Sequence, residues 1–419
     1  MAQTQATQQS GAIRPFRVEV TDAELDDLRR RIRATRWPEQ ETVTDESQGV
    51  RLATIQELAR YWGTDYDWRK CEAKLNTLPQ FITEIDGLDI HFIHGRSKHE
   101  DALPVIVTHG WPGSTIEQLK IIVPLTNPAA HGGSASDAFH VVIPSMPGYG
   151  FSGKPKTTGW DPARIARAWV ELMKRLGYKQ FVAQGGDWGA VVTDLMAKQE
   201  PPELLAIHTN MPGVVPPDVW RAIQSGGPPP MGMSGEEQAT YEKLKGFFTT
   251  SVAYALEMGT RPQALYGIAD SPVGLAAWLI DHGGGDTPPS AASGGDAPPA
   301  AALIAAARTP TGSGHPATEL TRDDVLDNIT LYWLTNSGVS SSRLYWENKV
   351  PFFDVKNVSI PTAVTVFPGE LYQTPKSWAE KAYPKLIHYN RVDKGGHFAA
   401  WEQPEIFVSE LRTAFKSFR

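Results

Sequence analysis

One turn constrains this chain more than any other stretch. The apolar run Phe181–Ala183 ends in the string Gln184-Gly185-Gly186-Asp187-Trp188-Gly189, and a helical pattern begins at Ala190. A strand, a tight turn and a helix, with glycines two residues before and after a central residue, predict a nucleophile elbow that holds this residue above a sheet. The central residue here is Asp187. By itself the string is also compatible with an ordinary turn, because Asp and Gly are common in turns.

An aspartate at such a turn restricts the chemistry. A carboxylate is ionised at neutral pH, so it can attack without a base to remove a proton. Attack by a serine on a saturated carbon would give an ether, whereas attack by Asp187 gives an ester that water can hydrolyse. We therefore expect substrates with a saturated carbon and a built-in leaving group, which are epoxides or alkyl halides. A serine esterase is excluded.

Composition limits the class of protein further. The chain has 419 residues, enough for a large core with additional domains, and its net charge of −7 gives no reason to expect nucleic acid. Its single cysteine, Cys71, excludes an intrachain disulfide. The polar stretch Met1–Gly11 lacks the apolar segment of a signal peptide, and no run approaches the roughly 18 apolar residues that span a bilayer. We expect a soluble, cytoplasmic protein without a membrane partner.

The patterns along the chain predict four regions. Residues 1–80 contain helical stretches after a capping box at Thr21 and are expected to form an N-terminal helical arm. Residues 81–212 and 355–419 alternate short strands with helices, which predicts an α/β core with a mostly parallel sheet covered by helices. Residues 213–354 are expected to form a helical lid. Within the lid, a Gly/Pro/Ala-rich insert at about 282–318 has too little apolar content to order itself, and its role is open.

Two further polar residues follow predicted strands of this core. Asp187, Glu370 and His397 occur in the order nucleophile, acid, histidine that is typical of α/β-hydrolases. Ligands of such sheets bind at the carboxyl ends of the strands, where all three are expected. Asp393 and Glu402 are alternative acids because they are close to His397 in sequence. We prefer Glu370 because the acid has to approach the histidine from a neighbouring strand.

Five strings, in order over nearly the whole chain, resemble those of the microsomal-type epoxide hydrolases. They are His109-Gly110-Trp111-Pro112-Gly113-Ser114, Gly185-Gly186-Asp187-Trp188-Gly189-Ala190, Asp270-Ser271-Pro272-Val273-Gly274-Leu275, Phe367-Pro368-Gly369-Glu370 and Gly395-Gly396-His397-Phe398. The N-terminal arm with Arg36-Trp37-Pro38 is also similar. The resemblance implies an α/β-hydrolase fold and the conversion of epoxides to vicinal diols, with no metal or organic cofactor. The chain departs from the family pattern in the lid, where it is one residue shorter between Pro262 and Asp270 and has the longer insert.

The resemblance also implies roles for individual residues. Asp187 would be the nucleophile, and His397, oriented by Glu370, would activate the water that hydrolyses the ester. The backbone N–H groups of Trp188 and, by resemblance, Trp111 would stabilise the oxyanion. Substrate and water are then the only partners required, with no nucleic acid; a homodimer is the assembly we consider, and detoxification the biological setting.

Two lid tyrosines complete the implied site. The family motifs map them onto Tyr254, before Gly259-Thr260-Arg261-Pro262, and Tyr345, within Ser342–Asn348. A phenol remains protonated at neutral pH, so it can donate to the alkoxide that forms as an epoxide opens. Tyr241, Tyr266 and Tyr332 are expected only to pack.

Two other functions share the expected fold. A haloalkane dehalogenase also uses an aspartate followed by a tryptophan, but it releases halide and needs no tyrosine pair. A non-catalytic ligand receptor is a third interpretation, because a fold does not determine a function. Release of diol from an epoxide, and of halide from a bromoalkane, would separate the three.

Overall fold

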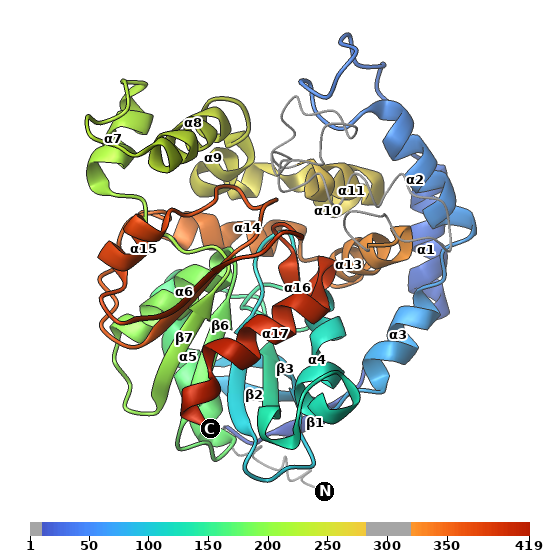
Figure 1. Ribbon diagram of the computed structural model, residues 1–419. Coiled ribbons are helices and arrows are strands. Elements are labelled where there is room, and N and C mark those ends of the chain that lie inside the picture. The colour runs from blue at the N-terminus through green and yellow to red at the C-terminus, as the bar shows by residue number, and fades with distance from the viewer. Residues whose placement is uncertain (1–10, 282–319) are drawn as a thin grey trace, which may run out of the picture.

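The computed structural model describes residues 11–281 and 320–419. The insert expected at 282–318 lies outside the described residues. The centre of the molecule is a nine-stranded sheet (Figure 1). Its strands are β1 (Arg14–Phe16), β2 (Gln80–Ile85), β3 (Leu88–Gly95), β4 (Leu103–Thr108), β5 (Phe139–Pro144), β6 (Phe181–Gly185), β7 (Leu204–Thr209), β8 (Thr362–Val366) and β9 (Leu386–Arg391).

The strand order places the predicted turn near the middle of the sheet. The order is β1-β2-β3-β5-β4-β6-β7-β8-β9. All neighbours from β5 to β9 pair in parallel, and β1, β2 and β3 join through antiparallel pairs. Every residue of β5 and β6 is buried, as expected for strands covered on both faces. The predicted mostly parallel sheet is confirmed.

Helices cover both faces of this sheet (Figure 1). One face carries α4 (Leu119–Thr126), α16 (Ala399–Glu402) and α17 (Pro404–Ala414), and the other carries α5 (Pro162–Arg175) and α6 (Trp188–Lys198). The start of α5 illustrates the local cause: the Asp161 side chain caps the helix, Pro162 occupies its first position, and Trp169 on its inner face is fully buried. A further helix, α15 (Lys376–Ala382), lies between β8 and β9 in the chain.

The N-terminal arm runs along one side of the molecule (Figure 1). It consists of α1 (Asp22–Arg33), α2 (Leu52–Thr64) and α3 (Trp68–Asn76). The strand β1 before α1 was not expected, because three residues are too short to show an alternating pattern; it pairs with β2, with Arg14 opposite Ile82. The arm is therefore part of the sheet as well as a helical layer.

The lid lies above the carboxyl ends of the parallel strands (Figure 1). Its described helices are α7 (Pro217–Ser225), α8 (Gly235–Thr250), α9 (Ala253–Thr260), α10 (Tyr266–Asp270), α11 (Pro272–Ile280), α13 (Arg322–Leu334) and α14 (Gly338–Glu347). Short 3-10 turns occur in the lid and in the core, and the described ones are η1 (Thr115–Gln118), η2 (Pro128–Ala130), η3 (Ala135–Asp137), η4 (Pro262–Ala264) and η6 (Lys416–Phe418). Arm and lid are tied together because Trp62 Nε1 of α2 donates to Thr330 Oγ1 of α13 at 2.9 Å.

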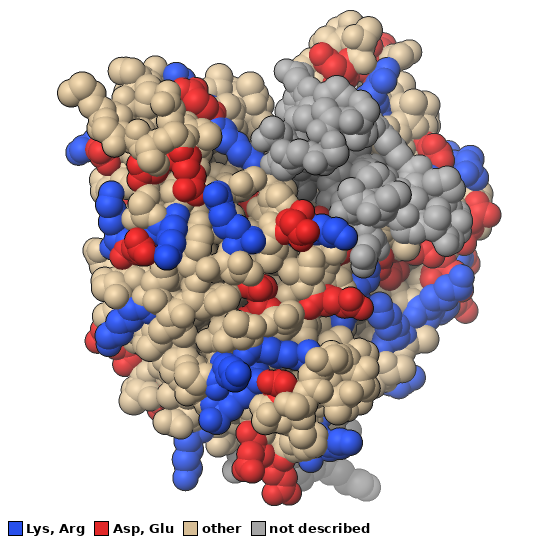
Figure 2. All heavy atoms as spheres, viewed as in Figure 1, with Lys and Arg blue, Asp and Glu red and all other residues tan. Residues whose placement is uncertain are grey.

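The surface shows no strong separation of charge on the face seen in Figure 2, where cationic and anionic side chains are interspersed. Within residues 11–281 and 320–419, no helix is both long and apolar enough to cross a membrane.

Candidate active site

Asp187 occupies a turn that only a few side chains tolerate. It follows β6 directly and has φ 51° and ψ −127°, a strained conformation for a residue with a Cβ. The flanking glycines make this turn possible. A Cβ on Gly185 would overlap the Gly189 carbonyl, and a Cβ on Gly189 would overlap the Thr108 carbonyl of β4. The spacing of glycines in the sequence thus reflects the close approach of three backbone segments.

The loop after β4 holds one oxygen of the Asp187 carboxylate. The backbone N–H of Trp111 donates to Asp187 Oδ1 at 2.8 Å, and the N–H of Trp188 also bonds this carboxylate. A Cβ on Gly110 would overlap the Asp187 side chain. Two backbone donors to one carboxylate are the kind of arrangement that stabilises negative charge on an acyl oxygen.

Helix α13 of the lid fixes this loop from above. Asn328 Nδ2 donates to the Pro112 carbonyl at 2.8 Å, and Asn328 Oδ1 accepts from Ser114 at 2.7 Å. The buried Tyr332 hydroxyl donates to the Gly113 carbonyl at 2.7 Å. Tyr332 therefore supports the site through the backbone. Tyr266, in contrast, was expected to pack and does not, since 67% of it is exposed.

His397 lies between two carboxylates. Its Nδ1 is 2.7 Å from Glu370 Oε1, and its Nε2 is 3.7 Å from Asp187 Oδ2. Glu370 follows β8 and His397 follows β9, and the two turns are joined because Gly369 N–H donates to the Gly395 carbonyl at 3.0 Å. Of the alternative acids, Asp393 is exposed and Glu402 accepts from Phe398 N–H at 2.8 Å. The carboxylate in contact with His397 Nδ1 is thus that of Glu370.

The charges of this group depend on one another. Burial lowers the pKa of His397, but Glu370, Asp187 and Glu117 raise it by more, so the pKa is about 9. Burial also raises the pKa of Asp187, which His397 and the N–H groups of Trp111 and Trp188 lower in part. Before reaction, the histidine is therefore an imidazolium at neutral pH, held by the two carboxylates on either side of it.

The two lid tyrosines meet above the nucleophile. The ring of Tyr254 (α9) stacks on Trp111 at 5.3 Å, and the ring of Tyr345 (α14) contacts Trp188 edge-on at 4.8 Å. The two tyrosine rings are 6.2 Å apart. Burial and the charge of Asp187 raise the pKa of Tyr254, and burial, Tyr254 and Asp187 raise that of Tyr345. Both phenols are therefore protonated donors, and both are close enough to Asp187 for its negative charge to raise their pKa.

A small cavity lies beside Asp187 and His397. Its volume is about 20 Å³, and its lining includes Glu117 and Gln118 of η1. We did not expect either residue in the site. They stand in a stretch that contains Ile116, Leu119, Ile121 and Ile122, and the only available signal was a charged residue among apolar ones.

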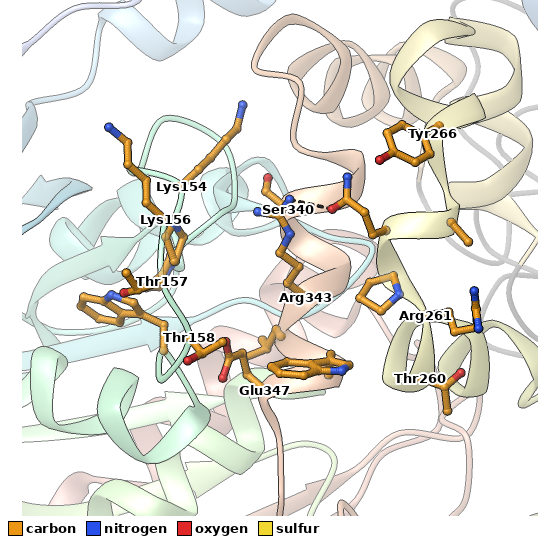
Figure 3. A pocket seen from close by; sticks show the side chains of 18 residues that line it. Lys154, Lys156, Thr157, Thr158, Thr260, Arg261, Tyr266, Ser340, Arg343 and Glu347 are labelled. Atoms are coloured by element: carbon orange, nitrogen blue, oxygen red, sulfur yellow. Dashed lines mark hydrogen bonds between the residues drawn. The ribbon is translucent and has the colours of Figure 1, made fainter.

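A much larger groove lies outside the site (Figure 3). It has a volume of about 1150 Å³ and is lined by α14, by the segment Lys154–Thr158 and by the residues around η4. Arg343 and Glu347 line it from α14, the same helix that places Tyr345 against Trp188. In the described parts of the chain, no group of three or more His, Cys, Asp or Glu side chains is placed to hold a metal.

Comparison with known proteins identifies relatives of the whole chain. Residues 13–118 match the family model "Epoxide hydrolase N terminus", and residues 104–242 match "alpha/beta hydrolase fold". A Stigmatella aurantiaca protein is 50% identical over 408 residues, which cover 97% of this chain and 86% of that protein. Epoxide hydrolase 1 of Oryctolagus cuniculus is 35% identical, with coverage of 96% and 88%. The juvenile hormone epoxide hydrolase of the silkworm Bombyx mori has a similar structure, with a TM-score of 0.81, 28% identity and coverage of 98% and 96%.

Proposed function

The chain belongs to the epoxide hydrolase family, and we propose that it converts epoxides to vicinal diols through a covalent ester on Asp187. One observation carries this mechanism: Asp187 stands at a positive-φ turn with one carboxylate oxygen on the Trp111 N–H and the other facing His397. A carboxylate held in this way presents Oδ2 to a substrate and Oδ1 to donors.

In the first step, Asp187 Oδ2 attacks an epoxide carbon and the carbon–oxygen bond of the ring breaks. Tyr254 and Tyr345 hydrogen-bond the epoxide oxygen and supply the proton that the alkoxide needs. Their positions over Trp111 and Trp188 support this role. No base is required, because the nucleophile is already ionised.

In the second step, His397 removes a proton from water, and the hydroxide attacks the carbonyl carbon of the ester. The N–H groups of Trp111 and Trp188 stabilise the oxyanion, and the diol leaves when the ester bond breaks. Formation of the ester itself prepares the base. With an effective dielectric constant of about 20, loss of a negative charge 3.7 Å from His397 Nε2 removes up to about 4.5 kcal/mol, or about 3 pKa units. A histidine with a pKa of about 9 in the free protein then becomes neutral near pH 7 in the ester.

The replacement His397→Gln tests the two-step route. The variant should form the ester but fail to hydrolyse it, giving a burst of about one epoxide per protein chain followed by very slow turnover. Mass spectrometry should find the protein heavier by one substrate, with the added mass on the peptide that carries Asp187.

A single turnover of the unmodified protein in ¹⁸O-water provides the control. The first diol should contain no solvent oxygen, because its new hydroxyl oxygen comes from the Asp187 carboxylate. Direct attack by water predicts a labelled first diol and no adduct in His397→Gln, and this pair of results would refute the covalent route.

The same assays separate the other interpretations. Halide release from a bromoalkane at a rate comparable to epoxide opening would favour a dehalogenase, and binding without turnover would favour a receptor.

Detoxification, a cytoplasmic location and the homodimer remain predictions from the sequence. Sedimentation of the purified chain would decide whether the homodimer forms.

A further inference from the structure

The second step needs a water molecule beside His397, and hydrogen-bonding groups of the protein have to hold this water in place. The small cavity offers them. Its volume of about 20 Å³ is that of a site for one water, and it is lined by Asp187, His397, Glu117 and Gln118 together with the backbone at Gly110 and Trp111. The nucleophile, the base and the loop that carries the Trp111 N–H thus all border one space.

Burial of the Glu117 side chain at this position lowers the stability of the folded protein. It is 8% exposed, and its carboxyl group lies so close to Gly113 that a Cβ on residue 113 would overlap it. Burial raises the pKa of Glu117 to about 8, with His397 opposing and Asp187 adding to the shift. A buried acid without a bonded cation costs stability, so a packing role alone does not account for its presence.

Gln118 supplies the second observation. Its Nε2 donates to Glu117 Oε1 at 2.8 Å. Its Oε1 is buried and has no hydrogen-bond partner among the described residues. An acceptor left without a partner beside a cavity of one water volume is the arrangement expected of a water site.

We propose that this cavity holds the water that hydrolyses the Asp187 ester, with Gln118 Oε1 accepting a hydrogen bond from one O–H group of this water and Glu117 orienting the Gln118 amide. His397 Nε2 takes the other proton as the water oxygen bonds to the ester carbonyl carbon. That proton is later returned to the alkoxide of the departing diol. The second water proton, left on the Asp187 carboxyl group, replaces the proton that the lid tyrosines gave in the first step, so the reaction is balanced without a further reactant. Gln118 touches the reacting water, and Glu117 is a positioning residue. The inference rests on the covalent mechanism proposed above.

The test measures the two steps separately in single turnovers, with rapid-quench sampling and mass spectrometry of the protein. Gln118→Met keeps the side-chain length and removes the acceptor. It should leave ester formation unchanged and slow ester hydrolysis about tenfold, the usual effect of one lost hydrogen bond, so the ester accumulates. Glu117→Met should do the same, whereas Glu117→Gln, which retains an acceptor for Gln118 Nε2, should restore most of the hydrolysis rate.

Thr115→Val is the matched control. Thr115 lies in the same turn, η1, and its buried hydroxyl has no hydrogen-bond partner among the described residues, so this near-isosteric change should alter neither step. If Gln118→Met hydrolyses the ester as fast as Thr115→Val, or slows both steps equally, the inference is wrong.

Two further experiments can refute the inference, one by crystallography and one with the His397→Gln variant. If the variants fail to fold, a high-resolution crystal structure of the unmodified protein decides: a water bonded to Gln118 Oε1 and near His397 Nε2 supports the site, and an unoccupied cavity contradicts it. If His397→Gln forms no adduct, the covalent route itself has failed, and the inference falls with it.

Discussion

Replacing Glu370 with Gln tests the electrostatic basis of the second step. Glu370 is 1% exposed, and its Oε1 is 2.7 Å from His397 Nδ1 and also accepts from Leu371 N–H at 2.7 Å. The amide has nearly the same shape as the carboxyl group, so the packing is retained. The change removes one negative charge, whereas the amide oxygen can still accept from His397 Nδ1 and so leave Nε2 free to act as the base.

The structure gives the size of the expected effect. At an effective dielectric constant of about 20, charges 2.7 Å apart interact by about 6 kcal/mol, and breaking buried ion pairs costs about 3–5 kcal/mol in practice. The pKa of His397 should therefore fall by about 2–4 units from its value of about 9. A histidine that is this weak a base loses most of the contribution of general-base catalysis, which is about 10²–10⁴ in rate.

The assay follows the approach to steady state with an epoxide in excess of protein, sampled by rapid quench. Ester hydrolysis in Glu370→Gln should be slower by about 10²–10⁴, while ester formation changes far less because Asp187 needs no base. The ester should then be the main species at steady state. The pH at which NMR shows His397 to titrate should be lower than in the unmodified protein.

Glu402→Gln is the control for this experiment. Glu402 is another buried acid near His397, but its Oε1 accepts from Phe398 N–H, a bond that Gln can still make. This variant should hydrolyse the ester at close to the normal rate. If Glu370→Gln behaves like Glu402→Gln, or if ester formation and hydrolysis slow by the same factor, the assignment of Glu370 as the orienting acid is refuted.

Three other predictions follow from the same structure. Tyr254→Phe or Tyr345→Phe should slow ester formation by about 10²–10³, the effect of one lost donor to a developing negative charge, and the double variant should nearly abolish it; a double variant that opens epoxides at a normal rate would exclude the pair. Gly189→Ala should unfold at a much lower temperature in calorimetry, because its Cβ would overlap the Thr108 carbonyl, whereas Ala at the exposed Gly235, which has open space around it, should have little effect. Burial raises the pKa of Asp327 to about 7, so folding favours its protonated form and this contribution is lost as pH rises from about 4 to 7. Asp327→Asn keeps an acceptor for the Tyr66 hydroxyl and does not ionise. As pH rises over this range, the melting temperature of the variant should therefore increase relative to that of the unmodified protein.

The elements of the core could be predicted because their signals are local. A capped helix such as α5 needs only Asp161, Pro162 and an apolar face, and the hairpin β2–β3 needs only two alternating strands around Asp86-Gly87. The nucleophile turn is also local, since its glycines are two residues from Asp187. In contrast, β1 could not be predicted, because its partner β2 lies more than 60 residues further along the chain and its three residues carry no pattern.

The sequence by itself determined the fold class, the order of the three polar residues after their strands and, through similarity, the family. Only the tertiary structure decided which acid touches His397, because Asp393 and Glu402 are nearer in sequence and the parallel pairing of β8 with β9 is what brings Glu370 to it. The same holds for Glu117 and Gln118: their sequence positions predict only a helical turn, and it is the folding of the loop after β4 over Asp187 that encloses them beside His397. A catalytic site of this kind is built from segments far apart in the chain, so its distances and charges depend on packing that no local pattern contains.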